Sequence, residues 1–341
     1  MKLRYLVAAV SAAASFSAHA ANSIDLGNYA VSGVYALDAF NGTSGGLSGL
    51  EASAVAYARD RIDPFTSKAG TLFFVGDEGT GVIEISRTGQ TIGSMTFDWT
   101  NTGSSKNDTE GLTYLGNGQL VVTEERLQNA YRFDYAAGGT ASLGSAAFAS
   151  VGPTIGNIGI EGISYDPRNG GFVTAKQDDP AQLSIFNTLS FSTTAAADAV
   201  PDVQFTGPAS SSSLFGLLSL SDVQTLAPID ALAGTAAADN LLVLSLDSRK
   251  LIEIDRLGNV KSSFDLASVL PHNGIEGLTV DEKGTIYLVA EQIQDGTGGL
   301  NPQSQLIVLS APVPEPETYA MMAAGLGLVG FAARRRKQAA Q

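Results

Sequence analysis

The sequence predicts an all-β protein folded as a five-bladed β-propeller. The first observation is that one short apolar strand, introduced by a polar residue, recurs five times at separations of 57, 51, 63 and 52 residues. The second is that further apolar strands follow each time, the first of them being TLFFVG, QLVVTE, GFVTAK, NLLVLS and TIYLVA. Units of this length cannot bury their own sheet faces and must stack on their neighbours, as propeller blades do.

The five units align on the polar residue four places before the end of the first strand. These residues are Ser53 in SAVAY, Glu110 in EGLTY, Glu161 in EGISY, Gln224 in QTLAP and Glu276 in EGLTV. Tight turns such as Gly116-Asn117-Gly118 separate the first two strands, as antiparallel hairpins require. Candidate fourth strands are SMTFDW and VKSSFDL. A six-bladed ring fits five units less well, and a two-domain sandwich would not explain the recurring Glu-Gly pairs.

The last unit supplies only three strands, so a strand from elsewhere must complete it. We predict that NYAVSGVYAL, residues 28–37, closes the ring against this last blade. The predicted propeller domain spans residues 22–311. Four pieces rich in Gly, Ser and Ala are expected to be surface loops, namely residues 41–49, 136–150, 191–200 and 207–213.

Residues 1–20 have the pattern of a secretory signal peptide. Lys2 and Arg4 precede an apolar run, and Ala18-His19-Ala20 has the small-x-small form that signal peptidase requires. We therefore expect cleavage by signal peptidase after Ala20 and export of the mature chain.

The other end, residues 313–338, has the composition of a membrane-targeting tail. Val313-Pro314-Glu315-Pro316-Glu317 precedes the uncharged, mostly apolar residues 318–333, a segment slightly short of a full membrane span. A basic run follows, consisting of Arg334, Arg335, Arg336 and Lys337. These charges would remain on the cytoplasmic side of the inner membrane and leave the body of the protein outside it.

This three-part order resembles a PEP-CTERM sorting signal, with Pro314, Glu315 and Pro316 at the motif position. The resemblance implies a Gram-negative host whose exosortase recognises the tail. The precursor would be anchored transiently in the inner membrane and then pass to the cell envelope or the extracellular space. A plain C-terminal transmembrane anchor is the alternative.

The composition excludes several kinds of site and partner. The chain has 20 basic and 34 acidic residues; without the six basic and two acidic residues of the two ends, 14 and 32 remain, a net charge of −18. Such a surface repels nucleic acid and attracts cations. The chain has no cysteine, and His272 is its only histidine beyond the predicted signal peptide, which excludes thiolate and multi-histidine metal sites. A Ser-His-Asp hydrolase would depend on His272, which we predict to lie in a turn.

The Glu-Gly pairs place acidic side chains beside the central channel. The innermost strand of each blade borders this channel, so Glu110, Glu161 and Glu276 would face one another at one rim. Glycine after each glutamate permits a φ or a close backbone approach that a side chain would forbid. Carboxylates this close repel unless some are protonated or a cation neutralises them. With Gln224 and Ser53 as neutral oxygen donors, the set favours Ca²⁺. The alternative is that each glutamate accepts N–H bonds in its own blade and meets no other.

The same segments resemble the SdiA-regulated family of bacterial propellers across most of residues 50–310. The ordered matches are DTEGLTYLGNGQLVVTEERLQNAYRFD, GIEGISYDPRNGGFVTAKQDDP, NLLVLSLDSRKLIEIDRLGNV and HNGIEGLTVDEKGTIYLVAEQ. The resemblance implies a five-bladed propeller with a calcium site. Near the ends of second strands it places Glu124, Gln177, Asp247 and Glu291. The first unit departs from the pattern, with Ser53 at the aligned position and Glu51 two residues earlier.

Two functions are compatible with these features. The favoured one is an exported, calcium-binding propeller that acts as a non-catalytic binding or structural module, with exopolysaccharide or other envelope components as partners. The alternative is a metal-dependent phosphoesterase or esterase resembling the phytase-like propellers, in which channel carboxylates hold calcium ions. It would need a basic lining for phosphate, for which the candidates are Lys176, Arg126, Arg249 and Lys250.

Overall fold

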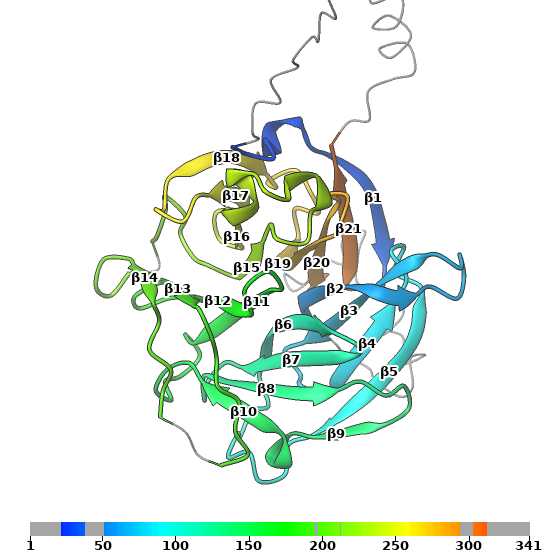
Figure 1. Ribbon diagram of the computed structural model, residues 1–341, viewed down its shortest axis with the longest axis vertical. Helices are drawn as coiled ribbons and strands as arrows, with labels where there is room; N and C mark the ends of the chain where they lie inside the picture. The colour runs from blue at the N-terminus through cyan, green and yellow to red at the C-terminus, as the bar shows by residue number, and fades with distance from the viewer. Residues whose placement is uncertain (1–21, 38–50, 195–196, 212, 294–302, 312–341) are drawn as a thin grey trace, which may run out of the picture.

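The computed structural model describes residues 22–37, 51–194, 197–211, 213–293 and 303–311. Within them the chain forms five sheets around a common centre (Figure 1), which confirms the predicted five-bladed propeller. The predicted signal peptide and sorting tail lie outside these residues. In the described part of the chain, no helix is long and apolar enough to cross a membrane.

Each of blades one to four runs along the chain from its innermost strand outwards. Blade one contains β2 (Ala52–Ile62), β3 (Ala69–Gly76), β4 (Gly81–Ile85) and β5 (Thr91–Asp98). Blade two contains β6 (Thr109–Gly116), β7 (Gln119–Glu124), β8 (Asn129–Asp134) and β10 (Ala147–Ser150). Blade three contains β11 (Ile160–Asp166), β12 (Gly171–Lys176), β13 (Gln182–Phe186) and β14 (Val203–Thr206). Blade four contains β15 (Asp222–Thr225), β16 (Leu241–Ser245), β17 (Lys250–Ile254) and β18 (Val260–Asp265). The predicted fourth strands SMTFDW and VKSSFDL are therefore confirmed as parts of β5 and β18.

Blade five combines the two ends of the propeller. Its inner strands are β19 (Asn273–Val280), β20 (Ile286–Ile293) and β21 (Gln305–Ser310), and the N-terminal β1 (Ala30–Ala36) is its outermost strand. β1 pairs antiparallel with β21, with Ala30 opposite Ser310 and Ala36 opposite Gln305. The predicted closing strand is thus confirmed, and Figure 1 shows β1 lying along β21.

The expectation that residues 136–150 form a loop is wrong. This piece contains β9 (Thr140–Ser142), the short 3₁₀ helix η3 (Leu143–Ser145) and β10. β9 adds a parallel fifth strand to blade one by pairing with β5, and β10 is the outer strand of blade two. This piece consists mostly of small residues, so its sequence shows no clear strand pattern. Its strands form because they pair with β5 and β8.

The core lies between the blades, because each sheet is packed between two others. On β3, Phe73 packs with Leu120 of blade two, whereas the next residue, Phe74, packs with Tyr287 of blade five. Successive side chains of a strand point to opposite faces, so both faces of β3 are buried. This explains why the second strands are continuous apolar runs instead of alternating ones.

Candidate metal centre at one end of the channel

The five innermost strands are β2, β6, β11, β15 and β19, and one hydrogen bond recurs at three of the junctions between neighbouring blades. A backbone N–H donates to a hydroxyl on the next inner strand, as in Tyr57 N to Thr279 Oγ1 at 3.1 Å, Tyr165 N to Thr113 Oγ1 at 3.0 Å and Thr225 N to Ser164 Oγ at 3.0 Å. In blades one and three the N–H belongs to the residue four places after the aligned polar residue, Ser53 or Glu161. Thr225 is therefore the counterpart of Tyr165, and Ser221 is the counterpart of Glu161.

The glutamates of the three Glu-Gly pairs lie near enough for their charges to interact, and we call Glu110, Glu161 and Glu276 the carboxylate ring. Burial raises the pKa of Glu110 well above its ordinary value, and the charges of Glu161 and Glu276 raise it further. The pKa of Glu161 is also raised, first by burial, then by Glu125 and Glu276. The charges of these three side chains, from blades two, three and five, therefore interact with one another.

A β-bulge accompanies each member of this ring. The pairing register shifts between Thr109 and Leu112, between Ile160 and Gly162, and between Ile275 and Gly277. A bulge removes one residue from the ladder and changes the direction of its side chain. The same shift occurs between Ala52 and Ala54, so it also brackets Ser53 in blade one.

The glycine after each glutamate allows neighbouring inner strands to approach closely. A Cβ on Gly162 would lie 2.7 Å from Asp222 Cα, and one on Gly277 would lie 2.6 Å from Ala54 Cα. Neither glycine has a φ in the left-handed region. Close backbone approach, and not an unusual φ, is therefore the reason for glycine at these positions.

A second acidic group, the acid cradle, consists of Glu51, Asp77 and Glu291. Each contributes one carboxylate oxygen to a set in which all oxygens lie within 4.8 Å of one another. Burial and then the Glu51 charge raise the pKa of Asp77 to about 8. Asp77 Oδ1 is buried and has no hydrogen-bond partner within the described residues. Such an atom lacks a donor or a cation.

The acid cradle adjoins the carboxylate ring. Burial raises the pKa of Glu276 well above its ordinary value, followed by the charge of Glu291 and a hydrogen bond to it, with Asp77 and Glu51 contributing further. Gln292 Nε2 donates to Glu51 Oε1 at 2.7 Å and fixes that carboxylate. The oxygens of blades one and five therefore face a common space.

Asp77 was not among the residues predicted from the sequence. Its N–H donates to Glu51 O at 3.2 Å, just as Glu125 N donates to Asp108 O at 2.9 Å and Gln177 N to Gly159 O at 3.0 Å. The functional position thus lies one residue beyond each of these second strands. The sequence contains this pattern, because Asp77, Glu125 and Gln177 are the third residues of VGDE, TEER and AKQD, which lie at the ends of the second strands of blades one, two and three.

In blade two this position is Glu125, and the predicted Glu124 points elsewhere. Glu124 is fully buried and accepts hydrogen bonds from Ser104 Oγ at 2.5 Å and Leu127 N at 2.6 Å, so it closes a loop of its own blade. Glu125 lies beside Glu161, and burial raises the pKa of Glu125 to about 7. Consecutive residues of a strand point to opposite faces, which separates the two glutamates.

The structure does not bring Gln224 to the carboxylate ring. It lies three residues beyond Ser221, where its Oε1 accepts from Thr279 Oγ1 at 3.2 Å and its Nε2 donates to Thr225 O at 2.9 Å. Ser221 is buried instead at the glutamate position, and its hydroxyl has no hydrogen-bond partner within the described residues. Ser53 also occupies this position and its hydroxyl donates to Glu51 O at 3.1 Å.

Blade four replaces Glu-Gly with Ser221-Asp222. The Asp222 carboxylate is buried and accepts the N–H groups of Val223 and Leu278, both at 2.7 Å. Burial nevertheless raises the pKa of Asp222 well above its ordinary value. Its side chain thus joins blades four and five at the position where blades two, three and five have a glycine.

Two other predicted residues, Lys176 and Asp247, are not part of the acid cradle or the carboxylate ring. Lys176 Nζ donates to the carbonyls of Asp178 and Pro180, and burial lowers its pKa. Asp247 is exposed, and its N–H donates to Ser219 Oγ at 3.3 Å.

Two further cations named for a phosphate site are also engaged. Arg126 pairs with Asp108 at 2.7 Å. Arg249 donates to four backbone carbonyls, those of Leu266, Val269, Leu270 and Asn273.

The chemistry of this end fits a hard cation. All donors are oxygens of carboxylates or hydroxyls, which suit calcium more than a transition metal. Calcium–oxygen distances are about 2.3–2.6 Å, so oxygens spaced as in the acid cradle can ligate one ion together. Glu51, Asp77, Glu291 and the adjoining Glu276 are the residues that would hold it.

Comparison with known proteins identifies the family. A family model described as SdiA-regulated matches residues 50–292. The chain belongs to the SdiA-regulated family. A PEP-CTERM protein-sorting motif matches residues 312–337 of this SdiA-regulated propeller, which confirms the predicted sorting signal. The motif indicates export through the envelope and processing by exosortase.

Similar solved structures include the glutaminyl cyclase of Myxococcus xanthus, at 11% identity and a TM-score of 0.49, with 84% of this chain and 97% of that chain covered. Another is Sqt1 of Chaetomium thermophilum bound to the N-terminus of ribosomal protein L10, at 11% identity, a TM-score of 0.39 and coverage of 76% and 58%. A third is a streptogramin B lyase, at 11% identity and a TM-score of 0.37, with 76% of this chain and 65% of that chain covered. At these scores the likenesses carry no argument about the function of the SdiA-regulated propeller.

Proposed function

We propose that this exported SdiA-regulated propeller is a calcium-binding module of the cell envelope or extracellular matrix that binds an envelope component without catalysis. The exosortase-dependent tail supports a role outside the cytoplasm, with a precursor anchored in the inner membrane before sorting. The acidity of the chain is compatible with cation binding and unfavourable for nucleic acid.

The observation that carries the calcium proposal is the meeting of the acid cradle with the carboxylate ring. Asp77 Oδ1 is buried without a partner, and the oxygens of Glu51, Asp77 and Glu291 lie within 4.8 Å of one another. Without a cation, these groups must remain partly protonated, as the raised pKa of Asp77 and Glu276 indicates. A divalent ion would neutralise them and join blade one to blade five next to the seam closed by β1.

A phosphoesterase would need free cations beside the metal to bind phosphate. Three of the four candidate cations, Lys176, Arg126 and Arg249, are bound to protein oxygens, as described above. We therefore favour the binding module over the metal-dependent phosphoesterase or esterase.

The test is thermal unfolding of the full chain with calcium and with a chelator. We expect calcium at about a hundred times its Kd to contribute about 2.7 kcal/mol, which raises the Tm of a protein this large by about 5 °C. Native mass spectrometry would give the number of bound ions. Equal Tm values in calcium and chelator would reject the calcium site, and calcium-dependent turnover of a generic phosphate or carboxyl ester would reject the non-catalytic role.

A further inference from the structure

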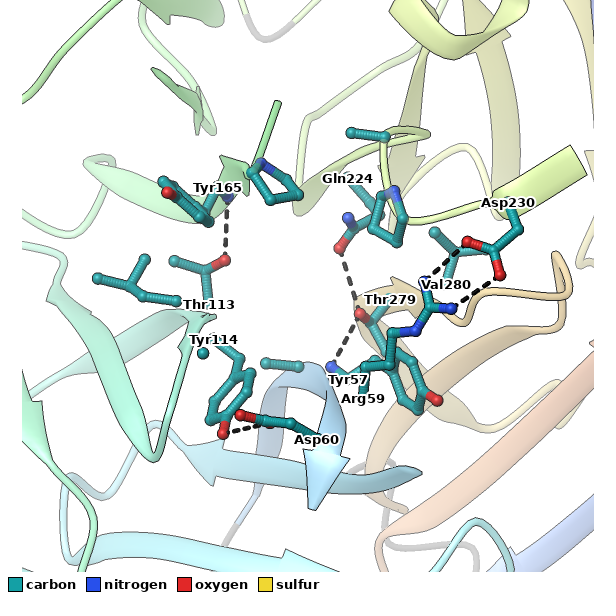
Figure 2. Close-up of a pocket in the computed structure, with 16 residues that line it drawn as sticks. Tyr57, Arg59, Asp60, Thr113, Tyr114, Tyr165, Gln224, Asp230, Thr279 and Val280 are labelled. Carbon is teal, nitrogen blue, oxygen red and sulfur yellow. Dashed lines mark hydrogen bonds and ion pairs between the residues drawn. The ribbon is translucent and has the colours of Figure 1, made fainter. Parts of the chain in front are cut away.

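The channel has a second mouth, at the opposite ends of the same inner strands. A cavity of about 580 Å³ opens there, and all five blades contribute to its lining. Figure 2 shows Tyr57, Thr113, Tyr165, Gln224 and Thr279 around this hollow. The volume lies within the range of sites that bind small molecules, about 300–1,000 Å³.

Three tyrosines from three blades supply aromatic surface to this cavity. Tyr114 stacks on Phe73 with ring centroids 5.8 Å apart, and Tyr165 packs on Phe172 at 5.2 Å. The hydroxyl of Tyr57 is held by Glu282. Because these contacts exist before any ligand arrives, little side-chain ordering is needed for binding.

The charged side chains at this mouth already have partners. Arg59 forms a bidentate ion pair with Asp230, at 2.7 and 2.8 Å. Asp60 accepts hydrogen bonds from Tyr114 Oη at 2.6 Å and Asn117 N at 2.7 Å. An ionic ligand would have to break these contacts, so the wall favours a neutral one.

Neutral polar groups lie deeper in the cavity. Thr113 Oγ1 accepts the N–H of Tyr165 at 3.0 Å, and its own hydroxyl hydrogen has no acceptor within the described residues. Gln224 uses one amide hydrogen for Thr225 O and retains the other. Such groups can donate to hydroxyl oxygens of a ligand, while tyrosine rings cover its apolar C–H surface.

We propose that this cavity binds one or a few units of a neutral polysaccharide. A pyranose unit combines an apolar C–H face with a rim of hydroxyls and carries no charge, which matches the tyrosines, the amide and hydroxyl donors, and charged side chains that already have partners. This inference rests on the proposed role as a binding module, but it does not depend on calcium.

The experiment measures binding of neutral trisaccharides to the full chain by isothermal titration calorimetry and saturation-transfer NMR. The probes are cellotriose, maltotriose, mannotriose and triacetylchitotriose, with trigalacturonate as the anionic comparison and spermidine as the cationic one. We expect at least one neutral probe to bind and neither charged probe to compete. Lack of binding by all four neutral probes, or stronger binding of a charged probe, would overturn the proposal.

Two variants locate the site. Ala227→Trp adds volume at a half-buried turn on the cavity wall and should abolish binding, and Tyr165→Ala should weaken it by about tenfold or more. Tyr35→Ala, which removes a half-buried tyrosine of the outermost strand β1, is the matched control and should bind as the parent does. Binding that survives Ala227→Trp would place the sugar elsewhere and overturn the proposal.

The calcium melt, run on the same variants, separates this proposal from the calcium site. A retained calcium response in Ala227→Trp shows that the variant is folded. Sugar binding without any calcium response would reject only the calcium site, and a calcium response without sugar binding would reject only the cavity proposal.

Discussion

The two ends of the channel are built by the same five inner strands and differ in how their charges are balanced. At the amino ends, carboxylate oxygens from blades one and five lie within 4.8 Å of one another, and Asp77 Oδ1 lacks a partner within the described residues. The charges of Glu110 and Glu161, from blades two and three, interact with that of Glu276. At the carboxyl ends, Asp230 pairs with Arg59 and Asp60 with Tyr114. An unbalanced end needs a cation or protons, whereas a balanced end can hold a neutral ligand. One scaffold thus offers two sites of different chemistry.

The largest expected effect tests whether calcium binds only at the acidic end of the channel. Replacing Asp77 by asparagine, and Glu276 and Glu291 by glutamine, should remove the expected Tm gain of about 5 °C. The measurement is calorimetry with calcium and with chelator. The control is Asp60→Asn at the other mouth, which should keep the full gain; an equal loss in both would contradict a site confined to one end.

A change of pH should alter the stability of the calcium-free protein, and the gain in stability from calcium, by nearly as much. Burial raises the pKa of Asp77 to about 8 and that of Glu125 to about 7, above their values in the unfolded chain. Without calcium, the folded protein therefore binds more protons than the unfolded chain between about pH 4 and 8, and its stability falls as pH rises through this window.

Calcium binds the ionised carboxylates, so its stabilising effect should grow from about pH 4 to about pH 8. Differential scanning fluorimetry across this range, with and without calcium, checks the sign. A calcium gain that is constant with pH would contradict the assignment of these carboxylates. Sugar binding in the cavity at the other end of the channel should vary little over the same pH range.

The glycines of the Glu-Gly pairs should be important for stability, because a larger residue there would clash with the neighbouring inner strand. Gly162→Ala would place a Cβ 2.7 Å from Asp222 Cα, and such overpacking destabilises by about 1–3 kcal/mol. Gly156→Ala is the matched control, because a Cβ there meets nothing within 4 Å. Urea unfolding measures both; equal stability of the two variants would show that the inner strands can separate without loss.

A smaller effect distinguishes Ser221 from Gln224 in blade four. Ser221→Asp adds a carboxylate at the fifth position of the rim and should tighten calcium binding about tenfold, equivalent to about 1.4 kcal/mol. Gln224→Asp places the same charge at the other mouth and should leave the calcium Kd unchanged. Titration calorimetry with calcium decides, and tighter binding only in Gln224→Asp would favour the original alignment.

The smallest effect concerns the ion pair at the neutral mouth. Arg59 and Asp230 have side chains that are 59% and 60% exposed, so solvent screens their attraction. Arg59→Gln combined with Asp230→Asn should leave Tm unchanged within error. We expect the pair to matter for ligand charge instead: Arg59→Gln alone should permit binding of spermidine, and failure to do so would weaken the charge argument.

Much of the fold could be predicted because it depends on local patterns. The repeated apolar strands gave the five blades, and the three-strand final unit required the closing strand β1. The pattern failed at residues 136–150, where β9 and β10 consist of small residues that are ordered by neighbouring strands.

The site could be predicted only in part. The glutamates of the Glu-Gly pairs stand out by repetition, but Asp77 lies in a unit whose aligned residue is Ser53. Glu124 and Glu125 are adjacent acids, and only the end of the β7 ladder decides which one faces the channel. The alignment of blade four was three residues out, because Ser221-Asp222 has no Glu-Gly to mark it.

The sequence alone determined the number of blades, the exported and sorted character of the chain, and the presence of acidic residues near one end of the inner strands. These properties follow from periodicity, composition and short contiguous motifs. Only the tertiary structure decided which oxygens meet and where a neutral cavity forms. Ring closure brings Glu51 to Gln292, 241 positions apart, and each bulge rotates one side chain, so the composition of both mouths depends on contacts that no local pattern records.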